Sequence, residues 1–189
     1  MVHLSAVLGK YTDFSILRFL LQHSSTSFYV KELSKKLSVS PASVSKLMNS
    51  LDGCSIVVKE EVGNVHSYSL NNESPLVRQM KVFDTLLRFD EIQLIGKFLD
   101  LDEGISSIIL YGSYADGSND NKSDIDLLVV SETKADFSAL LEKLSGAMNA
   151  EITLLQYKVS ELNKLKREDS VFYSRLKETH ILLYGAGLP

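Results

Sequence analysis

The sequence reads LYGSYADG at residues 110–117 and SDIDLL at residues 123–128, and these two stretches decide the fold of the second half of the chain. The apolar run over 105–111 predicts a strand that ends at a glycine and a serine. The second stretch begins with acidic residues and then becomes wholly apolar, which is typical of a strand entering a core. We therefore expect two strands joined by a polar, glycine-containing loop.

Two aspartates share one face of the second strand. Side chains two residues apart on a strand point to the same side, so Asp124 and Asp126 project together, roughly 6.5–7 Å apart. Two carboxylates in this position repel each other unless a cation lies between them, and Mg²⁺ prefers a few carboxylates together with phosphate oxygens and water. Two such ions about 3.5–4 Å apart can hold both the attacking and the leaving oxygen of a phosphoryl displacement. The pair predicts a Mg²⁺ site.

Gly112 and Ser113 follow the first strand. A glycine there lets backbone N–H groups approach a phosphate closely, and the serine hydroxyl adds a donor. Each half of the pattern also fits a simpler explanation, namely an ordinary turn or a solvated strand end. The combination, with only residues 114–123 between the serine and Asp124, favours a nucleoside triphosphate site.

This combination resembles the minimal nucleotidyltransferases of the DNA polymerase beta superfamily, in which Gly-Ser is followed at a similar spacing by Asp-x-Asp inside an apolar strand. The resemblance covers roughly residues 104–185. It implies a mixed sheet with flanking helices, Mg²⁺ as cofactor, ATP or another NTP as substrate, and transfer of NMP to an acceptor hydroxyl with release of pyrophosphate. It also implies that Asp124 and Asp126 hold the metal, while Gly112 and Ser113 hold the triphosphate.

The superfamily has a third catalytic carboxylate on a later strand, and Glu151, before the apolar run 152–155, is the candidate. The alternative is an exposed charge at a strand end. The chain departs from the family at Asp116, where many relatives have an arginine. A carboxylate at this position would repel a triphosphate unless a metal ion lies between them.

The first half of the chain predicts three helices, over 5–22, 30–37 and 41–51, followed by a hairpin of strands at 56–60 and 65–70. Ser40 and Pro41 are typical of a helix start. This order resembles a winged helix-turn-helix domain. The resemblance implies a DNA contact through the outer face of the third helix, at Ser43, Lys46 and Asn49, since Asn can hydrogen-bond adenine and Lys guanine. An acidic wing favours the alternative of a protein contact.

We therefore expect an α+β protein with an N-terminal winged helix-turn-helix over 1–74, a connecting helical region over 75–103 and a nucleotidyltransferase-like mixed sheet with flanking helices over 104–189. The amphipathic stretch 76–99 is interpreted as core or as the seam of a homodimer.

Length, charge and cysteine content limit the possible domain number, partners and location of the protein. At 189 residues the chain fits one large domain or two small ones. Its net charge of −4 divides into +2 for residues 1–70 and −6 for the rest, a weak case for nucleic acid in the first part. The single cysteine excludes an internal disulfide, and we expect a cytoplasmic protein without an export signal or a membrane partner.

The functional expectation is transfer of NMP, first of all AMP from ATP, to a protein or RNA acceptor, with a toxin partner as one protein acceptor. Two alternatives belong to other classes. One is a regulator that binds duplex DNA and senses nucleotide without turnover, and the other is an antitoxin-like structural partner.

Overall fold

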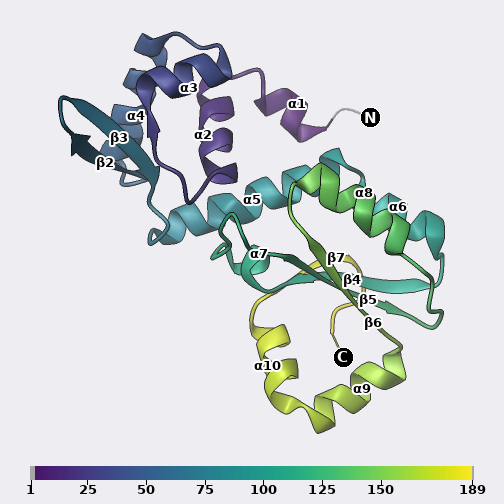
Figure 1. Cartoon of the computed structure of the whole chain (residues 1–189). Helices are drawn as coiled ribbons and strands as arrows, with labels where there is room; N and C mark the ends of the chain where they lie inside the picture. The colour runs from purple at the N-terminus through teal and green to yellow at the C-terminus, as the bar shows by residue number, and fades with distance from the viewer. Residues whose placement is uncertain (1–2, 189) are drawn as a thin grey trace. The chain divides into compact units, whose positions relative to one another are not determined.

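The computed structural model describes residues 3–188, with the backbone alone at Val62 and Ser170, and it divides into two units after Leu87 (Figure 1). The division falls inside helix α5 (Pro75–Glu91), so the two ends of this helix belong to different units. It lies within the segment 75–103 that the sequence analysis treats as a connecting region.

The N-terminal unit is a winged helix-turn-helix. Its elements before α5 are α1 (Leu4–Leu8), α2 (Thr12–Gln22), β1 (Phe28–Tyr29), α3 (Val30–Leu37), α4 (Pro41–Gly53), β2 (Val57–Val62) and β3 (Val65–Leu70). The strands form an antiparallel sheet in the order β1-β3-β2, and β2 turns into β3 at Gly63-Asn64, where Gly63 has a φ of +63°. The predicted hairpin is confirmed. The short β1 has no counterpart in the prediction.

Local sequence explains the helix boundaries of this unit. Ser40 begins α4, because its hydroxyl accepts a hydrogen bond from the backbone N–H of Ser43 and Pro41 occupies the first turn, as predicted. The helix expected over 5–22 is two helices, separated around Gly9, because glycine in a helix interior costs about 1 kcal/mol relative to alanine.

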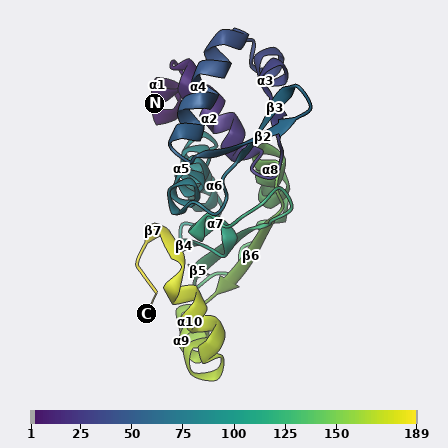
Figure 2. The same ribbon diagram turned by 90° about the vertical axis from the view of Figure 1, so that its left-hand side faces the viewer.

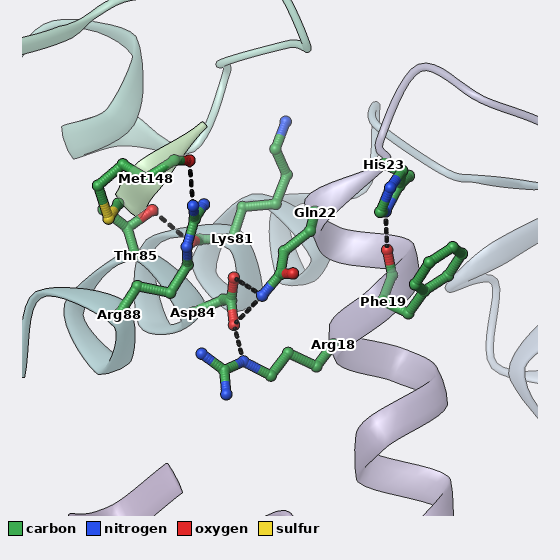
Figure 3. A network of polar contacts seen from close by, with 9 residues as sticks. All are labelled: Arg18, Phe19, Gln22, His23, Lys81, Asp84, Thr85, Arg88 and Met148. Carbon is green, nitrogen blue, oxygen red and sulfur yellow. Dashed lines mark hydrogen bonds and ion pairs between the residues drawn. The ribbon is translucent and has the colours of Figure 1, made fainter. Parts of the chain in front are cut away.

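A polar cluster joins α2 to the first part of α5 within the N-terminal unit (Figure 3). The Arg18 Nε donates to Asp84 Oδ1 at 2.7 Å, and the Gln22 amide donates to both oxygens of the same carboxylate at 3.1 and 3.4 Å. Only 7% of the Asp84 side chain is exposed. Protein groups, Arg18 and Gln22 among them, therefore bind this carboxylate in place of water.

The C-terminal unit is built on a four-stranded mixed sheet in the order β6-β5-β4-β7, where β5 and β6 are parallel and the other neighbours antiparallel. The elements after α5 are α6 (Leu94–Leu101), β4 (Ile105–Tyr111), α7 (Ser113–Asp116), β5 (Ile125–Ser131), α8 (Ser138–Met148), β6 (Ile152–Tyr157), α9 (Val159–Glu168), α10 (Ser170–Glu178) and β7 (His180–Gly185).

Helices cover both faces of this sheet (Figure 1, Figure 2). Helices α9 and α10 pack on one face through a buried cluster of Ile109, Leu128, Val130, Leu162, Tyr173 and Leu176. On the side of α6 and α8 the rings of Phe98 and Phe137 pack at 5.0 Å between centroids. The Arg88 guanidinium, from the last part of α5, donates to the carbonyl of Met148 at the end of α8 (Figure 3).

The α+β class is confirmed, with a winged helix-turn-helix followed by a mixed sheet with flanking helices. The stretch 76–99, expected as one amphipathic segment, is interrupted at Gln93, whose φ is +53°. Between α9 and α10, the carboxylate of Asp169 caps α10 by accepting from the N–H of Phe172. In the described part of the chain, no helix has the length and apolar character needed to cross a membrane.

Candidate active site

The loop that leaves β4 is held against the carboxylate of Asp126. Gly112 has a φ of +70°, in the region that favours glycine, and a Cβ built on it would lie 2.3 Å from Asp126 Oδ2. The backbone therefore lies so close to this carboxylate that a side chain at position 112 would clash with it. Ser113 then begins the short helix α7, and its carbonyl accepts from the N–H of Asn119, which folds the loop back.

The two predicted aspartates act on each other electrostatically. Asp126 is half-buried on β5, where its Cα pairs with that of Tyr111 on β4, and Asp124 is exposed directly before the strand. Burial, and then the negative charge of Asp124, raise the pKa of the Asp126 carboxyl above its ordinary value. The structure thus brings together Gly112, Asp124 and Asp126, as the sequence predicts.

The chemistry of these donors fits a divalent cation. Within residues 3–188, no lysine, arginine or histidine forms an ion pair with Asp124 or Asp126. Two carboxylates that repel each other without a cation of the chain between them are suited to Mg²⁺, which also takes phosphate oxygens and water. The same described residues hold no group of three His, Cys, Asp or Glu side chains arranged as a complete metal site.

Glu151 lies next to Asp124 in the sheet and not next to Asp126. Its backbone carbonyl accepts from the N–H of Ile125 at 2.8 Å, because Ile125 and Ile152 are paired in the parallel ladder. The residue paired with Asp126 is Thr153. Since paired residues of neighbouring strands point to the same face, the position beside Asp126 carries a hydroxyl. The role of Glu151 as third carboxylate stays a prediction.

Tyr111 is a site residue that the sequence analysis did not single out. Burial, followed by the negative charge of Asp126 and by Tyr157, raises the pKa of the Tyr111 hydroxyl to about 12. The phenol therefore stays protonated and can donate a hydrogen bond at the edge of the site. Its place directly before Gly112, on the same strand face as Asp126, is the signal that could have identified it.

The carboxylate of Asp116 is hydrogen-bonded to the segment that directly follows it. It is exposed at the end of α7, and one carboxylate oxygen accepts from the N–H of Ser118 at 2.8 Å. The negative charge that distinguishes this chain from the family pattern is thus bound to the loop that follows α7.

The three residues predicted to contact DNA are exposed on α4, and two of them have partners within the unit. The hydroxyl of Ser43 is hydrogen-bonded to that of Ser40 at 2.8 Å, and Asn49 Oδ1 accepts from the Tyr68 hydroxyl at 3.3 Å. Lys46 belongs to the same exposed face.

Replacing Gly112 with alanine should damage the candidate site directly. The new Cβ would clash with the Asp126 carboxylate, and the alanine would have a strained positive φ. The loop and the aspartate must therefore move apart. If the site binds Mg²⁺-ATP, the affinity should fall at least about tenfold, a loss of about 1.4 kcal/mol. Isothermal titration calorimetry measures this, with Gly146→Ala in α8 as the control, because a Cβ there meets open space. Unchanged affinity of G112A would contradict the arrangement.

Comparison with known proteins assigns the C-terminal fold. The family model "Polymerase beta, Nucleotidyltransferase" matches residues 93–186, so the predicted nucleotidyltransferase fold is confirmed for this region. No curated protein matches the chain.

Several solved structures are similar to part of the chain. A toxin–antitoxin crystallised with AMP-PNP is 26% identical over 49% of this chain and 71% of its own, with a TM-score of 0.37. A mutant of the toxin–antitoxin MntA–HpeT is 22% identical over 51% and 73%, with a TM-score of 0.40. The adhesin competence repressor AdcR from Streptococcus pyogenes is 20% identical over 51% and 72%, with a TM-score of 0.37.

Proposed function

We propose that this chain is a Mg²⁺-dependent nucleotidyltransferase that transfers NMP, in the first place AMP from ATP, to a hydroxyl group of a protein or RNA acceptor. The observation that carries the proposal is the contact of Gly112 with the Asp126 carboxylate beside Asp124. A loop suited to phosphate and a pair of carboxylates suited to a cation thereby share one place in a domain that matches the nucleotidyltransferase family model.

The residues have separate tasks in this reaction. The backbone at Gly112 and the Ser113 hydroxyl bind phosphate oxygens of the triphosphate. Asp124 and Asp126 would hold Mg²⁺, which when bound neutralises charge on the phosphates. The acceptor oxygen forms a bond to the α-phosphorus, the bond from that phosphorus to the bridging oxygen breaks, and pyrophosphate leaves. Glu151 is the carboxylate we assign to accept the proton of the acceptor hydroxyl.

The direct test is transfer of label from α-³²P-ATP, in the presence of Mg²⁺, to the protein itself and to components of a cell lysate. We expect one labelled product of defined size, and its sensitivity to protease or ribonuclease then separates a protein acceptor, such as a toxin partner, from an RNA. A protein that binds Mg²⁺-ATP but labels nothing would contradict the transferase and favour a nucleotide-sensing regulator.

A second candidate function, binding of duplex DNA, is favoured by the exposed face of α4 in a winged helix-turn-helix. If Lys46 contacts a phosphate, Lys46→Gln should weaken DNA binding and reduce the slope of log affinity against log salt by about 1. Fluorescence anisotropy at several salt concentrations measures the slope, and Lys10→Gln, exposed between α1 and α2, is the matched control. An equal effect of both variants would show only a loss of net charge, and salt-insensitive binding would count against the regulator.

A further inference from the structure

A cavity of about 340 Å³ opens beside the candidate phosphate loop, and the sequence analysis assigned nothing to it. It lies between the end of β4, helix α10 and Thr179, the residue directly before β7. Its lining consists of Tyr111, Gly112, Phe172, Arg175, Leu176, Glu178 and Thr179. Gly112 lines this cavity and also lies against the Asp126 carboxylate, so a molecule bound in the cavity would lie next to the candidate site.

The lining divides into an aromatic floor and a polar rim. The rings of Tyr111 and Phe172 meet edge to face, with centroids 6.3 Å apart and planes at 90°, and the buried Leu176 also lines the cavity. Arg175 and Glu178 lie three residues apart on α10, hence on one face of the helix, and both are exposed. A concave site lined by apolar and aromatic side chains, with a few charged hydrogen-bonding groups, is typical of small-molecule binding.

The guanidinium of Arg175 is available to a ligand. Among the residues that the structure describes, no carboxylate forms an ion pair with this guanidinium. The backbone carbonyl of Arg175, by contrast, accepts hydrogen bonds from the N–H and the hydroxyl of Thr179, at 3.3 Å each. A guanidinium supplies donors only and a carboxylate acceptors only, so Arg175 and Glu178 together match a ligand that carries both kinds of group.

We infer that this cavity receives the nucleoside part of the triphosphate, with the base against Phe172 and Tyr111 and with Arg175 and Glu178 hydrogen-bonded to the base edge or the ribose. The inference rests on the proposed function, because the position of the phosphates at Gly112 and Ser113 places the nucleoside next to them. Arg175 is a substrate-binding residue in this arrangement, since it contacts the nucleoside and not the reacting phosphorus.

The test compares two probes on the full chain by isothermal titration calorimetry in the presence of Mg²⁺, namely ATP and inorganic tripolyphosphate, which has no nucleoside. Arg175→Gln and Phe172→Leu should each weaken ATP binding about tenfold, since base–aromatic and charged hydrogen-bond contacts have this magnitude. Tripolyphosphate binding should stay unchanged. Phe172→Leu keeps an apolar side chain on α10, and Arg175 is exposed, so both variants are expected to fold.

The control is Arg167→Gln, which removes the same charge from the exposed surface of the neighbouring helix α9, outside the cavity. It should leave both affinities unchanged. ATP binding that survives both cavity variants would overturn the nucleoside site while leaving the proposed transferase intact. Equal weakening of tripolyphosphate by Arg175→Gln would also overturn it, because the arginine would then bind phosphate. A wild-type chain that binds neither probe would overturn the transferase as well.

Discussion

Replacing Asp124 and Asp126 together with asparagine is expected to lower nucleotide transfer by at least about a thousandfold, because the pair loses the negative charge that would hold Mg²⁺ at the triphosphate. Asparagine has nearly the same shape as aspartate, so the sheet should not be disturbed. The folded chain should even gain slightly in stability. The raised pKa of Asp126 means that burial and Asp124 disfavour its charged form in the fold, and the asparagine removes that penalty at neutral pH.

The measurement is transfer from α-³²P-ATP by the double variant, with its thermal unfolding followed by circular dichroism. The matched control is Glu132→Gln, which neutralises an exposed carboxylate directly after the other end of β5. This control should keep full transfer. Retained transfer by the Asp124/Asp126 variant, in a chain that unfolds at the wild-type temperature or above, would remove the metal-ligand argument altogether.

The part of the site that could be predicted from sequence is the part whose geometry is local. Gly112 and Ser113 end one strand and Asp124 and Asp126 begin the next, and strand periodicity alone places both aspartates on one face. The register of β6 on β5 could not be predicted in this way, since register is set by the packing of whole strands. Sequence could nominate Glu151, but only the ladder shows that Thr153 is the residue paired with Asp126.

Helix interruptions and contacts between distant parts of the chain could not be predicted from the sequence either. Gln93 adopts a positive φ although no glycine marks the break, so the amphipathic spacing of the stretch 76–99 does not reveal the interruption. The cavity beside Gly112 is lined by residues of α10, about 60 positions further along the chain, and no spacing rule connects them. Tyr111 was not predicted to be a site residue because an aromatic residue in an apolar strand is ordinarily a core residue.

Replacing Asp84 with alanine is expected to destabilise the N-terminal unit by about 3 kcal/mol, which is the lower end of the range for breaking a buried ion pair. The variant leaves the Arg18 guanidinium without the carboxylate it donates to, and leaves the Gln22 amide without the acceptor of its two hydrogen bonds (Figure 3). The lower end applies because a fifth of the Arg18 side chain is still exposed and can take up water.

The loss should be confined to the elements that the cluster joins. Amide hydrogen exchange followed by mass spectrometry should show lower protection in α2 and in the first part of α5, and unchanged protection in β5. Glu60→Ala, an exposed carboxylate on β2, should stay within about 0.5 kcal/mol of wild type in urea unfolding. A double replacement, Arg18→Met with Asp84→Leu, should recover part of the stability, because it leaves no unpaired charge of this ion pair, while the Gln22 amide still lacks its acceptor. If Asp84→Ala alone behaves like Glu60→Ala, the carboxylate does not hold α2 to α5, and apolar contacts such as those of buried Val77 must do so.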